Sequence, residues 1–219
     1  MLELIDSSRD RLLGYLVRQV ENFFPDGKDP NELQSILDAH LDEALSRVGH
    51  CISFVKLWRE NQFDYMHSSQ YAIFLYFLSN TIWRKTGDRG VCTRLFCLNK
   101  ALNGIDCFYE IELPPVLFIG HSVGIVLAKA TYGNHLVLYQ NSTVGKSHGI
   151  APVLGDGVIM YPNTAVIGAS NVRSGSVIAQ GVSVINRDTP GNCLVFQAEA
   201  GALAFRDMDR DILADIFRL

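Results

Sequence analysis

Six apolar residues recur at every sixth position in the last third of the chain, a spacing that neither a helix nor a flat strand produces. An α-helix repeats every 3.6 residues and a β-strand repeats every two. A strict period of six is typical of a parallel β-helix, in which each hexapeptide forms one face of a triangular coil and its apolar residue points inward. The six residues are Leu154, Met160, Val166, Val172, Ile178 and Val184.

The fourth residue after each of these is mostly small, which suits the tight corner of such a coil. These corner residues are Val158, Thr164, Ser170, Ser176, Val182 and Asp188. The same period predicts inward-facing residues earlier in the chain, so the coil is expected to begin well before the first of the six. The earlier positions are Val126, Tyr132, Leu138 and Val144.

The repeat is interrupted once. Between Val144 and Leu154 the spacing is ten residues instead of six, so four extra residues must bulge out of the coil. Loops that leave a rigid scaffold often carry function, although an insertion of this kind is equally well read as a tolerated surface loop. The bulge holds Lys146, Ser147, His148 and Gly149.

Residues 1–104 have helical periodicity instead. Apolar residues from Leu13 to Phe24 form one stripe, which ends at Pro25. Asp29 and Pro30 predict the start of a second helix, as N-cap and first-turn proline. The second stripe consists of Leu33, Ile36, Leu37, Leu41, Leu45, Val48 and Ile52.

Two further helices are expected, over residues 68–85 and 91–102, with Gly104 ending the last one. The segment from Tyr71 to Leu78 is apolar all round, so it is expected to be buried either in the helical bundle or in a subunit contact. The sequence therefore predicts an α+β protein with three parts. These are a helical domain (1–104) that serves oligomerisation, a β-helix (105–206), and a C-terminal tail helix (207–219).

Composition excludes several classes of protein. The chain has 219 residues, is 48% hydrophobic and carries a net charge of −4, so it can form a core and lacks the charge of a general nucleic-acid binder. The five cysteines form no regular framework, and their odd number favours reduced thiols in the cytoplasm. No signal peptide and no membrane span are expected, because charges interrupt the N-terminal segment and no apolar run reaches ~20 residues.

His121 is the leading candidate for catalysis. It lies in the segment Ile-Gly-His-Ser-Val-Gly, where glycines on both sides favour a tight turn with an exposed imidazole. Histidine is the natural general base near neutral pH, although a single histidine in a turn is more often an ordinary surface residue. The role of His121 therefore has to be inferred from the surrounding sequence.

That surrounding sequence resembles the serine acetyltransferase family, within the hexapeptide acyltransferases. The segment Gly104-Ile105-Asp106 stands fifteen residues before His121 without a gap, as the family's Asp-Ile-His-Pro segment does. The residues from Ser122 to Val126 are similar to the family's Gly-Gly-Ile-Val stretch, and those from Tyr139 to Gly145 to its Gln-x-Val-Thr-Leu-Gly segment. The resemblance implies a left-handed β-helix. This hand comes from the resemblance alone, because ordinary crossover rules favour the opposite hand.

By this resemblance the protein is expected to transfer an acetyl group from acetyl-CoA directly to a hydroxyl. His121 would take the proton of the hydroxyl, and Asp106 would orient the imidazole; Glu110 and Glu112 are rival carboxylates. The resemblance also implies a slot for the pantetheine arm. Gly145, Ala179 and Gly181 are its expected small residues, and Lys146 is placed to meet a phosphate of CoA.

The acceptor is less well defined. His67 and His148 are the candidate substrate-binding residues, but Gly120 replaces the family's aspartate before the catalytic histidine. Ala151 stands where the family has the histidine of a His-Pro pair, and Phe196-Gln197-Ala198 opens the segment that replaces its Gly-x-Pro-Ala. These departures keep two other hypotheses open beside L-serine acetylation in cysteine biosynthesis. One is acetylation of a sugar hydroxyl or amine in surface polysaccharide biosynthesis, and the other is a non-catalytic scaffold.

The resemblance further implies a homotrimer, or a dimer of trimers paired through the helices, with active sites between subunits. It also raises cysteine synthase as a partner for the C-terminal tail, which ends Ile216-Phe217-Arg218-Leu219. No metal site is expected, because the histidines and cysteines lack ligand spacing.

Overall fold

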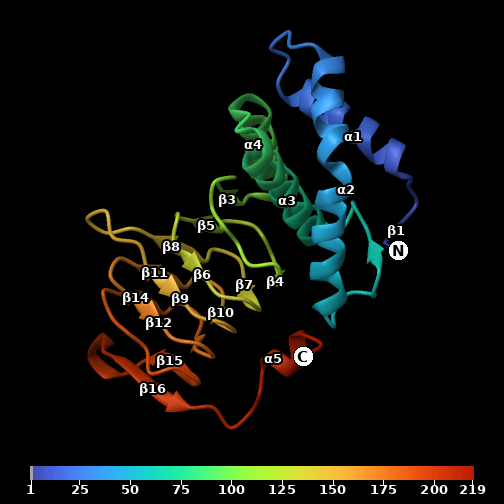
Figure 1. Cartoon of the computed structure of the whole chain (residues 1–219). Helices are drawn as coiled ribbons and strands as arrows, with labels where there is room; N and C mark the ends of the chain where they lie inside the picture. The colour runs from blue at the N-terminus through green and yellow to red at the C-terminus, as the bar shows by residue number, and fades with distance from the viewer. Residues whose placement is uncertain (1) are drawn as a thin grey trace.

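The computed structural model describes residues 2–219 and consists of a helical bundle followed by a left-handed parallel β-helix (Figure 1). The α+β prediction is therefore confirmed. The chain changes from helices to coils between Asn103 and Asp106. Within the described range, no helix is both long and apolar enough to cross a bilayer. The bundle consists of α1 (Arg9–Phe23), α2 (Pro30–Phe54), α3 (Ser68–Thr86) and α4 (Arg89–Asn103).

The ends of the helices follow the capping residues of the sequence. The side chain of Asp29 accepts a hydrogen bond from the backbone N–H of Asn31, with Pro30 in the first turn of α2. Gly104 adopts a left-handed conformation with a φ of 67° and ends α4. Its carbonyl accepts a hydrogen bond from the N–H of Gly124 at 2.9 Å, so the end of the bundle is fixed to the first coil of the β-helix.

Helix α3 lies in the middle of the bundle and contacts both α2 and α4. Every residue from Tyr71 to Leu78 is buried within the single chain. Of the two expectations for this segment, burial in the bundle is therefore confirmed. The segment is not available for a subunit contact.

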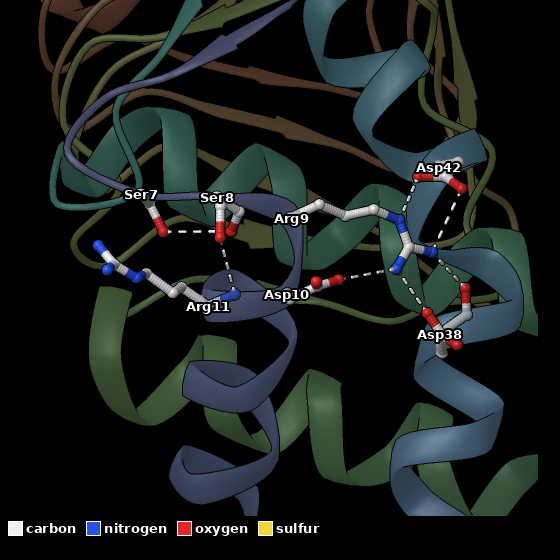
Figure 2. A network of polar contacts seen from close by, with 7 residues as sticks. All are labelled: Ser7, Ser8, Arg9, Asp10, Arg11, Asp38 and Asp42. Carbon is white, nitrogen blue, oxygen red and sulfur yellow. Dashed lines mark hydrogen bonds and ion pairs between the residues drawn. The ribbon is translucent and has the colours of Figure 1, made fainter.

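A polar network joins the start of α1 to α2 (Figure 2). The guanidinium of Arg9 donates to Asp38 Oδ1 at 2.6 Å and to Asp42 Oδ1 at 2.7 Å. Ser8 caps α1 by accepting a hydrogen bond from the N–H of Arg11. This network orients the first two helices at the surface of the bundle.

The β-helix has three parallel sheets, one on each face of the coil. The first sheet contains β4 (Leu117–Ile119), β7 (Leu136–Leu138), β10 (Ile159–Met160), β13 (Val177–Ile178), β15 (Cys193–Gln197) and the antiparallel β16 (Leu203–Asp207). The second contains β3 (Asp106–Cys107), β5 (Val126–Leu127), β8 (Thr143–Gly145), β11 (Ala165–Ile167) and β14 (Ser183–Ile185). The third contains β6 (Thr131–Tyr132), β9 (Val153–Leu154) and β12 (Asn171–Val172), and a separate pair joins β1 (Glu3–Leu4) to β2 (Gln62–Phe63).

The six-residue period determines the core of the β-helix. All six inward positions from Leu154 to Val184 are 1% exposed or less. The predicted corner residues are also buried, with one exception. Asp188 is exposed, and the next residue, Thr189, is buried at that corner and shares a hydrogen bond of 2.8 Å with the hydroxyl of Ser176. A buried carboxylate there would need a partner, whereas a hydroxyl fits.

The prediction for Val126 is wrong. Val126 is 44% exposed, and Leu127 pairs with Val144 on the inner face. The neighbouring strand explains the register, because Asp106 pairs with Val126 and Cys107 with Leu127. Since side chains alternate along a strand, turning Val126 inward would also bury the carboxylate of Asp106.

The bulge is a short hairpin. Val144 pairs with Val166, 22 residues further on, whereas Val166 pairs with Val184 after 18 residues, so the coil contains the four predicted extra residues. Ser147 and Ile150 pair through two backbone hydrogen bonds. Between them His148 and Gly149 have φ values of 49° and 80°, as a two-residue hairpin turn requires.

The C-terminal tail returns along the β-helix to the end of α2 (Figure 1). The predicted amphipathic helix over 207–219 is wrong for most of its length, since only α5 (Leu213–Ile216) is helical. Phe217 is fully buried and forms a β-bridge with Val55. The guanidinium of Arg218 donates to the carbonyl oxygens of Val55 at 2.7 Å and Trp58 at 2.8 Å, so the tail packs on its own chain.

Candidate active site

His121 lies at a corner of the β-helix, in the turn that follows β4. The N–H of Gly120 donates to the carbonyl of Leu138 in the next coil, and the hydroxyl of Ser122 donates to the carbonyl of Asn103 at 2.6 Å. The turn is thus held from both sides. The imidazole of His121 is exposed and makes no hydrogen bond within residues 2–219.

The same corner recurs in successive coils, and backbone hydrogen bonds define which residues are equivalent. The N–H of Tyr139 donates to Met160, and that of Tyr161 to Ile178, just as Gly120 donates to Leu138. The column of equivalent positions is therefore Gly120, Tyr139, Tyr161 and Ala179. We call residues 120–124, 139–142, 161–164 and 179–182 the His121 corner.

Two tyrosines in this column were not predicted from the sequence. The rings of Tyr139 and Tyr161 are stacked, with centroids 5.4 Å apart and planes 17° apart. Both are half-buried, and burial raises the pKa of Tyr139. Tyr139 also occupies the space beside Gly120, where an added Cβ would lie 2.5 Å from the ring. The Tyr139 ring therefore leaves no room for a side chain at position 120.

The start of α3 lies against the same turn. The hydroxyl of Ser69 donates to the carbonyl of Gly120 at 3.3 Å. His67, the N-cap residue of α3, is exposed and packs edge-on to Trp58 with ring centroids 5.9 Å apart. Trp58 in turn contacts Phe118, two residues before Gly120. The structure thus brings the region of His67 to the His121 corner.

Asp106 has a different partner from the one expected. Its carboxylate accepts a hydrogen bond from Lys100 Nζ at 2.6 Å, and within residues 2–219 no hydrogen bond joins it to His121. The rival carboxylates are engaged elsewhere, since Glu110 pairs with Lys129 at 3.4 Å and Glu112 accepts from Asn80. Lys100 was missed because its contact with Asp106 depends on where α4 ends.

Gly145, Lys146 and His148 lie at a different corner, across the second sheet. A strand of three residues such as β8 spans about 10 Å, so this corner is at least that far from His121 on one chain. Lys129, Lys146 and Arg187 are all exposed around it. We call the residues around Gly145 in successive coils, 128–130, 145–150, 167–170 and 185–189, the Lys146 corner.

Of the expected CoA-slot residues, Ala179 and Gly181 belong to the His121 corner instead. Gly181 has a φ of 76° and an added Cβ would meet nothing within 4 Å, so the backbone there is open. Gly145 is more crowded, because a Cβ would lie 2.7 Å from Ile167 Cδ1. The predicted slot is therefore divided between two corners of the single chain.

Residues 2–219 contain no group of three His, Cys, Asp or Glu side chains that could hold a metal ion. All five cysteines are free thiols, and burial raises the pKa of Cys51 to about 12. One corner has an imidazole with aromatic rings, and the other has the exposed cations Lys146 and Arg187 together with the exposed carboxylate of Asp188.

Comparison with known proteins shows the fold. No family model and no curated sequence matches the chain. Among solved structures, serine acetyltransferase from Vibrio cholerae is 15% identical, with a TM-score of 0.69 over 94% of this chain and 82% of that one. The Neisseria gonorrhoeae enzyme in complex with serine is 18% identical, with a TM-score of 0.63 over 88% and 83%.

A third structure, serine acetyltransferase from Brucella abortus in complex with Coenzyme A, is 16% identical, with a TM-score of 0.66 over 91% of this chain and 82% of that one. The matches cover both the bundle and the β-helix. The chain therefore has the fold of serine acetyltransferases, with a helical domain followed by a left-handed β-helix of hexapeptide repeats.

Proposed function

We propose that the protein is an acetyl-CoA-dependent O-acetyltransferase in which His121 is the general base. The observation that carries this proposal is the exposed, unpaired imidazole at a coil corner of this fold. An alcohol is a weak nucleophile at neutral pH, and an imidazole within hydrogen-bond reach activates it by accepting its proton. The fold neighbours bound to serine and to Coenzyme A support the same chemistry.

The reaction needs no acyl-enzyme, because a thioester is already activated. The acceptor oxygen forms a bond to the acetyl carbon while its proton moves to His121. The bond between that carbon and sulfur then breaks, and the imidazolium returns the proton to the departing thiolate. The products are the acetyl ester and CoA.

Asp106 is proposed to orient His121 in the assembled enzyme. For this role its carboxylate must exchange Lys100 for the imidazole. Because the Lys100–Asp106 pair is exposed, with the side chains 55% and 34% accessible, the exchange costs little. A carboxylate on one ring nitrogen fixes the tautomer and stabilises the imidazolium.

We infer that the donor site lies between two copies of the chain. CoA carries several negative charges on its phosphates, and the exposed side chains of Lys146 and Arg187 suit them. Lys129 is already paired with Glu110, and the exposed carboxylate of Asp188 lies in the same corner. Lys146 and Arg187 lie across the second sheet from His121, so a homotrimer that sets the Lys146 corner of one copy beside the His121 corner of the next would unite them. Ala179 and Gly181 would then border the pantetheine arm, and a dimer of trimers would have to use surfaces other than Tyr71–Leu78.

The fold neighbours make L-serine the first acceptor to test, which would place the protein in cytoplasmic cysteine biosynthesis. His67 is proposed to lie at the acceptor end, and His148, in the hairpin, at the subunit boundary. Docking of the tail into cysteine synthase would require Ile216, Phe217 and Arg218 to leave the bundle. A sugar hydroxyl is the alternative acceptor.

The test is release of CoA from acetyl-CoA by the purified protein. L-serine is compared with other amino acids, methyl glycosides and nucleotide sugars. Acceptor-dependent release supports the proposal, and the acceptor that works defines the pathway. Failure to bind acetyl-CoA at all would support the non-catalytic scaffold instead.

A further inference from the structure

A cavity outside both corners lies where the helical bundle meets the β-helix. Its volume is about 510 Å³, and it is lined by α2, the end of α3 and the segment that leads into β4 (Figure 1). Strand β4, which spans about 10 Å, separates Pro115 from the turn of His121, so the cavity is not part of the candidate active site. The lining residues are Ser46, Arg47, His50, Arg84, Glu112, Leu113 and Pro115.

The guanidinium of Arg47 is held in one orientation at the wall of this cavity. Its Cζ atom lies 4.4 Å from the centre of the Phe77 ring. Its Nη1 atom donates to the carbonyl of Phe77 at 3.2 Å and to the hydroxyl of Thr81 at 2.8 Å. Within residues 2–219 neither Nε nor Nη2 donates a hydrogen bond. One edge of the guanidinium is thus bound to α3, and the other edge, which can bind two oxygens of one anion, is free.

Arg47 lacks the partner that comparable arginines have. Among residues 2–219 four arginines are half-buried, and the three others pair with carboxylates. Those pairs are Arg9 with Asp38 and Asp42 (Figure 2), Arg94 with Asp26, and Arg218 with Glu60. Within the same range Arg47 forms no ion pair. A partly buried charge without a counter-charge costs free energy, so this position favours an anion.

Arg84 brings a second unpaired cation to the cavity. It is exposed in the last turn of α3 and forms no ion pair among the described residues, whereas the next residue, Lys85, pairs with Glu43 at 3.1 Å. Burial lowers the pKa of Arg47, and the positive charge of Arg84 acts in the same direction. The two guanidinium groups therefore repel each other, and an anion bound to both would offset this repulsion.

Glu112 limits the charge of the anion. Its carboxylate lines the cavity and accepts a hydrogen bond from Asn80 at 3.4 Å, but it forms no ion pair within residues 2–219. With His50 neutral, two guanidinium groups and one carboxylate leave a single positive charge, which suits a singly charged ligand. Leu113 and Pro115 add an apolar wall. A short organic acid combines one negative charge with an apolar chain, whereas phosphate lacks the chain.

We propose that this cavity is a binding site for a small organic monocarboxylate, whose two oxygens bind to Nε and Nη2 of Arg47 and whose charge is shared with Arg84. The apolar chain of the ligand packs on Leu113 and Pro115. Because the ligand contacts α2, α3 and the segment before β4 together, it links the helical bundle to the β-helix. The site does not depend on the proposed acetyl transfer.

Ligand-observed NMR titration of the full-length protein tests the site, in a chloride buffer at constant ionic strength. The probes are propanoate and butanoate, with phosphate and propan-1-ol as comparisons that lack the chain or the charge. We expect the two carboxylates to bind more tightly than either comparison. Arg84→Gln should weaken propanoate binding about tenfold, because it removes one charged contact. Arg89→Gln, the same change at an exposed arginine outside the cavity, is the matched control and should bind as the wild type does.

Arg47→Lys keeps the charge and removes the two-donor edge, so it should also weaken propanoate binding. Thermal unfolding of each variant checks that it is folded, and the exposed Arg84 gives an independent test if Arg47→Lys is unstable. Failure of the wild-type protein to bind propanoate would overturn the proposal, and so would phosphate binding as tightly. Propanoate binding that is unchanged in Arg84→Gln would place the ligand elsewhere and overturn it too.

Discussion

The two edges of the second sheet differ in chemistry although the same repeat builds them. The His121 corner has an imidazole, two stacked tyrosines and amides. The Lys146 corner has a hairpin, the exposed cations Lys146 and Arg187, a Lys129 that pairs with Glu110, and the exposed carboxylate of Asp188. A hexapeptide repeat fixes only its inward residues, so each corner is free to acquire its own ligand chemistry. On the proposed function, the acceptor and the phosphate-bearing donor bind to different corners, and a second copy of the chain would bring the two together.

The largest effect is expected at the His121 corner. His121→Asn should lower kcat by about 10²–10⁴-fold, because it removes the general base. The side chain is exposed and makes no contact within the described chain, so the melting temperature should stay close to that of the wild type. Steady-state CoA release and thermal unfolding are the two measurements. Wild-type turnover in this variant would remove His121 from the mechanism.

Gly120→Ala is expected to destabilise the same corner. An added Cβ would lie 2.5 Å from the Tyr139 ring, and such overpacking costs about 1–3 kcal/mol. Denaturant unfolding measures the loss. The double variant Gly120→Ala with Tyr139→Ala provides the control, since removal of the ring gives the methyl group room. If Gly120→Ala alone is as stable as the wild type, Tyr139 does not occupy this space.

At the Lys146 corner the effect should fall on binding of the donor. Lys146→Glu should raise the KM for acetyl-CoA about tenfold and leave kcat nearly unchanged, because an exposed cation that meets a phosphate is replaced by an anion. Lys28→Glu, which makes the same exposed change in the bundle, is the matched control. An unchanged KM for Lys146→Glu would separate this corner from the donor site.

The smallest effect concerns the third corner of the coil, between the third and first sheets, where His135 lies between β6 and β7. His135 lies against Phe217 with ring centroids 5.1 Å apart, and burial lowers its pKa from the usual 6.5. Below pH 6.5 the unfolded chain binds a proton more readily than the folded chain, so the free energy of unfolding should fall as the pH falls. The stability contributed by neutral His135 is fully present above that pH.

His135→Asn should flatten this pH dependence, and asparagine tolerates the φ of 56° found there. Denaturant unfolding of both proteins between pH 7.5 and about pH 5 provides the comparison. Equal slopes for the two proteins would mean that another group carries the effect.

The sequence predicted the helices, the coil and its insertion because each depends on local spacing or capping. The prediction for Val126 failed because Ile125, Val126 and Leu127 are three consecutive apolar residues, so the strand fits the six-residue period in two registers. Pairing with the strand of Asp106 decides between them, and that pairing is not visible in the period.

The tyrosine column was missed for a related reason. Gly120, Tyr139, Tyr161 and Ala179 are separated by 19, 22 and 18 residues, because the first coils are irregular and one contains the hairpin. No fixed period connects them. The division of the expected CoA residues between two corners could not be predicted either, because it depends on the order of the sheets around the coil.

The most direct test of a site shared between the two corners is complementation. His121→Ala and Lys146→Glu chains with different tags are co-expressed, and assemblies carrying both tags are purified and assayed at low acetyl-CoA concentration. In a mixed cyclic trimer one site in three combines an intact His121 with an intact Lys146 from the neighbour, so CoA release should recover to about one third of the wild-type rate. Release no greater than that of the separate variants, or a monomeric protein by light scattering, would contradict the account.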